Sequence, residues 1–290
     1  DEKERLRISN ILAKMFDEEK FSTKDVIFGL NSSASVFMEQ MDVPIMEGKD
    51  LNKAMPSFIE AAQEGVTAAE NEISWPIRGE VDTPNGPRMR VLVYRCFAEY
   101  AREVAEVIEK AGLTVVGADI NALAALRAIA IQNRPDRQVD AIVDIGANVM
   151  SLMLHHNGVP MMLTLDPDNA GEVATSKVLD ALGLDEGQED QAEFHKINDD
   201  HNIGIVTQAR NDYSKALAAR VGGYFRSNVE RSDEIDSIAA VTLVGGGALL
   251  AGLGYYLREA LGDVPMTYAQ FDPKITSSTG RQIPRQEPSS

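Results

Sequence analysis

The stretch DAIVDIGANVMSLMLHHNGVPM, residues 140–161, decides the fold of this chain. An apolar run ends at Asp144, Gly146 and Asn148, a second apolar run follows, and Asn157-Gly158 marks a tight turn. This alternation predicts strands joined by short turns. A carboxylate, a glycine and an amide therefore stand at the junction of two strands.

The junction itself suggests an anion site. Gly146 permits backbone torsions that other residues resist, and the successive N–H groups of Gly146, Ala147 and Asn148 can form a nest for an anion. A carboxylate beside a phosphate is understandable if Mg²⁺ lies between them, held by Asp144 through water. A plain hairpin with an aspartate at its turn is the alternative, and the motif alone leaves both interpretations open.

A second motif is AAVTLVGGGALLAGLGYYLREALG, residues 239–262. An apolar strand meets Gly245, Gly246, Gly247 and Ala248, and a helix follows. Such glycines let the backbone approach a flat or polyanionic ligand, and a helix N-terminus adds positive potential. The spacing matches neither the dinucleotide fingerprint nor the P-loop. Tight packing of strand against helix is the alternative.

Two further pairs are candidate site residues. Glu193 and Lys196, in QAEFHK (191–196), stand three apart on one helix face, where a solvent-exposed ion pair is the simpler interpretation. Asp119 and Asn121 stand where a strand becomes a helix, and Asp119 could simply cap that helix.

Composition excludes several classes of protein. The 290 residues are 44% hydrophobic and 25% charged, and the net charge is −17. A nucleic-acid partner needs a basic patch, and an anionic membrane surface would repel this chain, so membrane association should run through a partner. The apolar runs fall short of the ~20 residues that span a bilayer. Cys96 is the one cysteine, which predicts a reduced compartment. The start at Asp1 without Met suggests a trimmed fragment.

The order of elements favours an α/β fold. Residues from 277 onward are rich in Ser, Pro and Gln and predict a flexible tail, 277–290. Strands are predicted at 25–30, 33–44, 113–118 and 240–246, with hairpins at 73–96 and 140–166. Helices are predicted at 4–16, 51–70, 98–111, 121–132, 171–182, 189–199, 207–230 and 249–262.

Taken together, the four motifs and their order resemble the actin-like nucleotide-binding superfamily, which includes actin, the 70-kDa chaperones and sugar kinases. Within it, the chain resembles the PilM family of type IV pilus assembly over roughly residues 20–275. The resemblance is carried by EKAGLTVVGADINALAALRA, VDIGANVMSLMLHHNGVP and TLVGGGALLAGLGYYLREALG.

The resemblance implies an actin-like ATPase fold, with two lobes around a nucleotide cleft and a small inserted subdomain. The implied parts are 1–30 with 118–140 (first lobe), 31–117 (insert, a compact sheet with two helices) and 141–276 (second lobe). ATP and Mg²⁺ are the implied cofactors. The turn at Asp144–Asn148 would be the second phosphate loop, Glu193 and Lys196 would border the ribose and base, and residues 245–248 would line the adenosine pocket.

The resemblance also implies partners and a location. A groove would take the N-terminal tail of a PilN-like membrane protein, and the chain would link it to the pilus motor ATPase. We expect no nucleic acid and no direct membrane span. The location implied is cytoplasmic, at the inner face of the membrane through partners.

Three departures from the family pattern argue against fast hydrolysis. We expect the first phosphate hairpin of the family to be missing from this sequence, which would begin in the helix that follows it. Asn121 is an amide that can orient a water but cannot take its proton, and Ala170-Gly171 replaces a Gly-Gly pair. We expect at most a slow ATPase. A scaffold without nucleotide, an FtsA-type cell-division protein and a small-molecule kinase remain alternatives.

Overall fold

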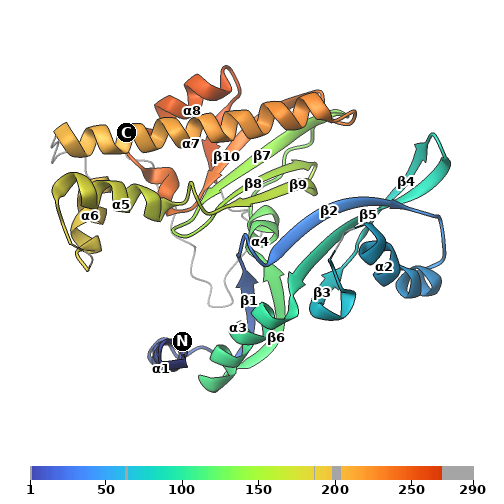
Figure 1. Cartoon of the computed structure of the whole chain (residues 1–290), viewed down its shortest axis with the longest axis horizontal. Helices are drawn as coiled ribbons and strands as arrows, with labels where there is room; N and C mark the ends of the chain where they lie inside the picture. The colour runs from blue at the N-terminus through green and yellow to red at the C-terminus, as the bar shows by residue number, and fades with distance from the viewer. Residues whose placement is uncertain (1, 63–64, 186, 198–203, 270–290) are drawn as a thin grey trace. The chain divides into compact units, whose positions relative to one another are not determined.

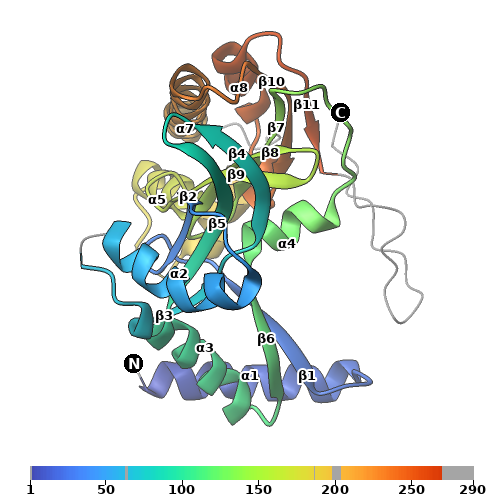
Figure 2. The ribbon, with the colours of Figure 1, turned by 90° about the vertical axis from the view of Figure 1, so that its right-hand side faces the viewer.

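The computed structural model describes residues 2–62, 65–185, 187–197 and 204–269. The chain forms two compact units, Asp1–Asn121 and Ala122–Ser290, whose elements are labelled in Figures 1 and 2. The finer division expected from the resemblance stays a prediction, and the expected tail at 277–290 lies outside the described residues.

The first unit contains two separate sheets. Its elements are α1 (Glu2–Glu19), β1 (Asp25–Leu30), β2 (Val36–Val43), α2 (Gly48–Ala62), the 3-10 helix η1 (Ala68–Glu70), β3 (Asn71–Ser74), β4 (Ile77–Thr83), β5 (Gly86–Phe97), α3 (Ala98–Lys110) and β6 (Thr114–Ile120). Strands β1 and β6 pair in parallel. Helix α1 packs against α3, and the Ser9 hydroxyl donates to the Val107 carbonyl oxygen at 2.8 Å.

The second sheet of this unit is antiparallel and runs β2-β5-β3, with β4 also paired to β5. Leu51, Met55 and Ile59 recur at helical spacing on α2 and are buried against Val91 and Val93 of β5. This burial of one apolar helix face holds α2 on the sheet. The hairpin predicted at 73–96 is confirmed by the pairing of β4 with β5.

The second unit is built on one five-stranded sheet of order β11-β10-β7-β8-β9. Strands β10 and β11 run parallel to β7, whereas β8 and β9 are antiparallel neighbours. Its elements are α4 (Asn121–Ala128, which begins at the unit boundary), β7 (Gln138–Ile145), β8 (Met150–His156), β9 (Val159–Asp166), α5 (Gly171–Leu182), α6 (Glu189–Ile197), α7 (Gly204–Arg231), β10 (Ser237–Val244), η3 (Gly246–Leu249), α8 (Leu253–Leu261) and β11 (Met266–Tyr268).

The core of this unit lies between the sheet and helices α7 and α8, and Figure 1 shows α7 running along the sheet. Alternate β7 residues Val139, Ala141, Val143 and Ile145 face this core and are fully buried. The intervening residues of β7 face the other way, because strand side chains alternate between the two faces. Asp140 and Asp144 therefore share that other face.

Two predicted helices end several residues early in the structure. The helix predicted over 51–70 ends at Ala62, and Gly65 has a φ of +78°, a left-handed torsion that cannot continue a helix. The helix predicted over 121–132 ends at Ala128, because Ile129 already forms a β-bridge.

Candidate functional site

Asp144 lies next to the end of β7, flanked in the sheet by Ser151 of β8 and Val244 of β10. Its carboxylate is partly buried, and no side chain among the described residues donates a hydrogen bond to it. Burial raises the pKa of Asp144, since desolvation penalises the charged form. A half-buried carboxylate without a donor among the described side chains is the strongest sign of a ligand site in this unit.

Gly245 brings the second motif against this carboxylate. Its φ is +83°, and a Cβ built there would lie 2.5 Å from the Asp144 Oδ1 and 2.5 Å from the Ile145 carbonyl oxygen. Only glycine has both the torsion and the space for this contact. The two principal motifs, a hundred residues apart in sequence, thus meet because β7 and β10 are parallel neighbours that end at the same sheet edge.

The remaining glycines of the second motif, Gly246 and Gly247, differ in how closely other atoms pack against them. A Cβ at Gly247 would collide with the Ile145 side chain, whereas a Cβ at Gly246 would meet no described heavy atom within 4 Å. The helix expected directly after the glycines is wrong: Gly246–Leu249 is a 3-10 turn, and α8 begins at Leu253. Gly246 is therefore exposed next to Gly245, but no α-helix begins directly after the triplet.

The turn after Asp144 needs its glycine for a different reason from the expected one. Gly146 does not have a positive φ, and neither do Ala147 and Asn148. A Cβ at Gly146 would instead lie 2.8 Å from the Val149 carbonyl oxygen, which accepts a hydrogen bond from the Gly146 N–H at 3.2 Å. Close approach, rather than an unusual torsion, requires glycine here.

The first turn of α5 holds the turn in place. The Gly171 N–H donates to the Gly146 carbonyl oxygen at 2.8 Å, and the Glu172 N–H donates to the Ala147 carbonyl oxygen at 2.8 Å. The Asn148 side-chain amide also donates to the Glu172 carboxylate at 3.3 Å. The N–H groups of Gly171 and Glu172, at the start of α5, thus already donate to backbone carbonyl oxygens of the turn.

Glu193 and Lys196 form an ion pair to which Thr175 of α5 is also bonded. The Lys196 ammonium donates to the Thr175 hydroxyl at 2.8 Å and is paired with Glu193, while the Thr175 hydroxyl donates to Glu193 at 2.6 Å. Lys196 is buried and Glu193 half-exposed, so the expected exposed pair is wrong for the lysine. Burial would raise the pKa of Glu193, but the bonds from Lys196 and Thr175 outweigh it, and the pKa is lowered.

Asp119 and Asn121 belong to the first unit, whereas the other ten candidate residues belong to the second. Asp119 is inside β6 opposite Gly29, and Ile120 separates it from α4, so it does not occupy the position directly before the helix. The Asn121 side-chain oxygen lies over Gly29, where a Cβ would collide with it. Glycine on β1 leaves room for this amide.

Sequence reasoning missed the loop that leads into α5. The buried Asp166 accepts hydrogen bonds from the Arg220 Nε at 2.6 Å and the Asp168 N–H at 3.0 Å, and Asn169 bonds to the same carboxylate. Burial would raise the pKa of Asp166, but the contacts from Arg220, Asn169 and the Asp168 N–H together outweigh it, and the pKa is lowered. The turn-forming sequence Asp166-Pro167-Asp168-Asn169 was a signal for this loop.

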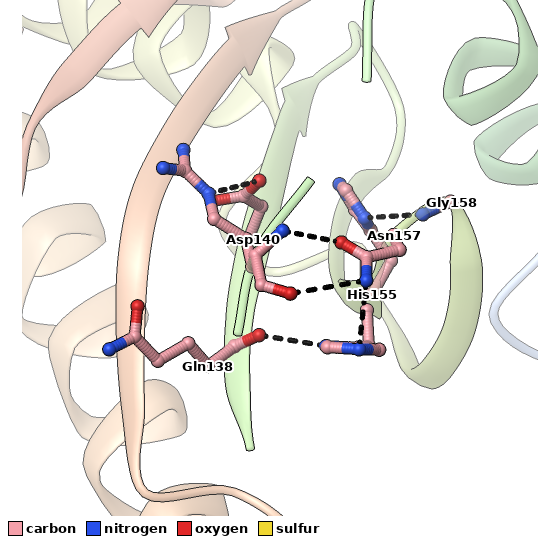
Figure 3. A network of polar contacts seen from close by, with 7 residues as sticks. Gln138, Asp140, His155, Asn157 and Gly158 are labelled. Atoms are coloured by element: carbon pink, nitrogen blue, oxygen red, sulfur yellow. Dashed lines mark hydrogen bonds and ion pairs between the residues drawn. The ribbon is translucent and has the colours of Figure 1, made fainter. Parts of the chain in front are cut away.

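Figure 3 shows a second polar cluster, around Asp140 near the start of β7. The Arg134 Nε donates to both carboxylate oxygens of Asp140, at 2.9 and 3.0 Å. The Arg134 N–H donates to the Asn157 side-chain oxygen at 2.7 Å, and the Asn157 side-chain amide donates to the Arg134 carbonyl oxygen at 3.2 Å. This cluster fastens the segment before β7 to the β8–β9 turn.

The histidines of this cluster serve the same structural purpose. His155 lies opposite Asp140 in the sheet and is buried; burial lowers the pKa of His155 despite the nearby carboxylate. The His156 Nδ1 lies 2.9 Å from the Gln138 carbonyl oxygen. Across the described ranges, no group of three or more His, Cys, Asp or Glu side chains is placed to hold a metal directly. Nor does any described helix have the length and apolarity to cross a bilayer.

Comparison with solved structures defines the class of fold. The PilM–PilN type IV pilus biogenesis complex is 21% identical, with a TM-score of 0.73 over 91% of this chain and 75% of that chain. The protein has the α/β fold of the actin-like ATPases. A family model described as type IV pilus assembly protein PilM matches residues 1–280. The chain belongs to this family, so its role lies in type IV pilus assembly.

Two other solved structures are more distant. The ethanolamine utilization protein EutJ from Carboxydothermus hydrogenoformans is 20% identical (TM-score 0.46; 59% of this chain, 56% of that chain). MreB 5 of Spiroplasma citri, bound to AMPPNP, is 18% identical (TM-score 0.43; 59% and 60%). At TM-scores below 0.5 these likenesses are too loose to support a statement about this chain. No curated protein sequence matches it.

Proposed function

We propose that the protein is a nucleotide-binding adaptor of type IV pilus assembly. It binds ATP with Mg²⁺ and links the N-terminal tail of a PilN-like membrane protein to the pilus motor ATPase, at the cytoplasmic face of the inner membrane. Membership of the PilM family supports the pilus role. The PilM–PilN complex supports the choice of membrane partner.

One observation carries the nucleotide part of the proposal. Asp144, with a raised pKa and no partner among the described side chains, lies against Gly245, where the backbone leaves no room for a Cβ. A cation would relieve the desolvated carboxylate, and the open position of Gly246 would let a flat ligand reach the backbone. The residues present therefore fit magnesium and a nucleotide.

Four of the candidate residues have specific roles in this proposal. Asp144 would hold Mg²⁺ through water, and Glu193 with Lys196 would bind the nucleoside. Bound Mg²⁺ would supply countercharge to the phosphates. Asn121 would orient a water without accepting its proton, so we propose slow hydrolysis at most, with nucleotide acting mainly as a structural switch.

Calorimetric titration with ATP, with and without Mg²⁺, tests the nucleotide site. Asp144→Ala should weaken Mg–ATP binding at least about tenfold, which corresponds to ~1.4 kcal/mol. Asp180→Ala on α5 removes the same charge from an exposed position and should bind like the parent. Without Mg²⁺, the parent should fall to the level of Asp144→Ala. Equal Mg–ATP affinity of parent and Asp144→Ala would refute the magnesium assignment.

A peptide-binding measurement tests the partner. The N-terminal tail of a PilN-like protein, labelled with a fluorophore, should raise its anisotropy on addition of the protein, through its leucines in an apolar groove. A scrambled tail of the same composition is the control. If both peptides bind alike, or neither binds, the adaptor role is wrong.

A scaffold that no longer binds nucleotide is a second candidate, and one observation favours it. The Gly171 and Glu172 N–H groups donate to carbonyl oxygens of the turn, so they are not available to a phosphate in this arrangement. A thermal-shift measurement separates the two candidates. A binder at 100 times its Kd gains about 2.7 kcal/mol, whereas a scaffold gains nothing.

A further inference from the structure

The Tyr213 side chain links α7 to the loop before α5. It is buried, and its hydroxyl lies 2.8 Å from the Asn169 carbonyl oxygen and 3.0 Å from the Ala170 carbonyl oxygen. Burial, with the Asp166 carboxylate nearby, raises the pKa of Tyr213, so the hydroxyl keeps its proton and remains a donor. The contact crosses 43 residues of sequence and belongs to no motif identified above.

The loop that Tyr213 holds is directly continuous with the contacts to the Asp144–Asn148 turn. The next two residues, Gly171 and Glu172, donate their N–H groups to the Gly146 and Ala147 carbonyl oxygens. A chain of hydrogen bonds therefore runs from the Tyr213 hydroxyl through the α5 N-terminus to the turn. A Cβ at Gly171 would lie only 3.2 Å from the Gly146 carbonyl oxygen, so loop and turn are packed closely.

Helix α7 contacts other parts of the candidate site as well. The Arg220 Nε binds Asp166 at the start of the same loop, 2.6 Å away. One turn before Tyr213, the Arg210 guanidinium donates to the Lys196 carbonyl oxygen at 3.5 Å. Helix α7 thus contacts both the loop before α5 and helix α6, which bears Glu193 and Lys196.

We infer that Tyr213 is a positioning residue that fixes the Asp144–Asn148 turn from α7, an inference whose consequence for ligand binding rests on the proposed nucleotide site. Tyr213 does not touch the ligand. It sets where the turn lies, so its hydroxyl should matter more to Mg–ATP affinity than to the overall stability of the unit.

Tyr213→Phe tests this inference, with Tyr224→Phe as the matched control. Tyr224 is on the same helix and packs against the same core, and the carbonyl oxygens of Asn169 and Ala170 accept their bonds from Tyr213 instead. Hydrogen exchange should accelerate about five- to tenfold at the Gly171 and Glu172 amides in Tyr213→Phe only, the effect of one lost hydrogen bond. Mg–ATP should bind that variant about fivefold more weakly than Tyr224→Phe.

Hydrogen exchange and Mg–ATP binding test the positioning role and the nucleotide site independently. If the parent does not bind Mg–ATP, the proposed nucleotide site is refuted, and amide exchange alone decides whether Tyr213 positions the turn. If exchange at Gly171 and Glu172 is the same in both variants, the inference is overturned. Should Tyr213→Phe not fold, Arg220→Gln replaces it, because Arg220 binds the start of the same loop from α7 and half of its side chain is exposed. It should raise exchange at the same amides, and unchanged exchange would again overturn the inference.

Discussion

Asp140 and Asp144 lie on the same face of the same strand, four residues apart, and their surroundings differ completely. Both carboxylate oxygens of Asp140 accept a hydrogen bond from Arg134, and Asn157 and His155 belong to the same polar cluster. Asp144 has no donor among the described side chains, and its pKa is raised by burial alone. The first carboxylate is therefore paired within the chain, whereas the second has no such pairing among the described side chains.

This difference separates a structural aspartate from a functional one. Burying a carboxylate is costly unless the charge is paired, so an unpaired one weakens the fold. A protein keeps such a group where a ligand makes use of it. The comparison predicts opposite effects of mutation at the two positions on stability and on nucleotide binding.

The largest effect is expected at Asp140. Asp140→Ala should lower the free energy of unfolding by about 3–5 kcal/mol, because it leaves Arg134 without its partner in a mostly buried site. Urea unfolding measures this loss. Nucleotide affinity of the folded fraction should stay at the parent value. A loss below about 1 kcal/mol would show that the pair is not structural.

The next effect is at Gly245. Gly245→Ala should cost about 2–3 kcal/mol, because alanine disfavours a φ of +83° and its Cβ would meet Asp144 and Ile145. Gly246→Ala, one residue away, should change stability by less than about 0.5 kcal/mol. The bulkier Gly246→Val should keep the fold and lose nucleotide affinity. Unchanged affinity in Gly246→Val would count against the adenosine pocket at residues 245–248.

A smaller effect of opposite sign is expected at Asp144. Asp144→Asn removes a desolvated charge while preserving shape, so at pH 7 it should raise the melting temperature, by about 2–4 °C for each kcal/mol relieved. The same substitution should abolish the dependence of nucleotide binding on Mg²⁺. A fall in melting temperature would mean that Asp144 has a stabilising partner.

The smallest effect expected is the pH dependence of the stability differences between the parent and its aspartate variants. The raised pKa of Asp144 means that its ionisation costs stability above the folded pKa and costs nothing below 3.8, the ordinary pKa of an aspartate in an unfolded chain. The advantage of Asp144→Asn should therefore vanish by about pH 3.5. Asp166 has a lowered pKa, so it stabilises the fold above 3.8 and loses this contribution as the pH falls through its folded pKa.

Thermal unfolding of Asp144→Asn, Asp166→Asn and the parent between about pH 3 and 7 checks both signs. Asp166→Asn should be less stable than the parent at pH 7, and the gap should close toward the acid end. If the two substitutions shift stability in the same direction at pH 7, the distinction between paired and unpaired carboxylates fails.

Much of the fold could be predicted from local patterns. The apolar runs that form β7, β8 and β10 and the turn residues Asn157-Gly158 indicated strands and their ends. The candidate residues Asp144 and Gly245 were found because each follows or ends such a run. Errors arose at helix ends, where Gly65 and Ile129 stopped helices that periodicity had extended.

The missed residues share one property, which is that their partners are distant in sequence. Thr175 joins Glu193 and Lys196 from another helix, and Tyr213 bonds to carbonyl oxygens 43 and 44 residues away. Backbone carbonyls carry no side-chain signal. Nothing in the local sequence marks such contacts before the chain has folded.

The sequence by itself determined which segments become strands, where their polar residues fall, and which family the chain resembles. Those properties follow from local periodicity and turn chemistry, which depend on near neighbours. Only the tertiary structure decided that Gly245 lies against Asp144 and that Asp140 is paired while Asp144 is not. The pairing of β7 with β10 and the donors around each carboxylate depend on how distant segments pack, and that is set by the whole unit.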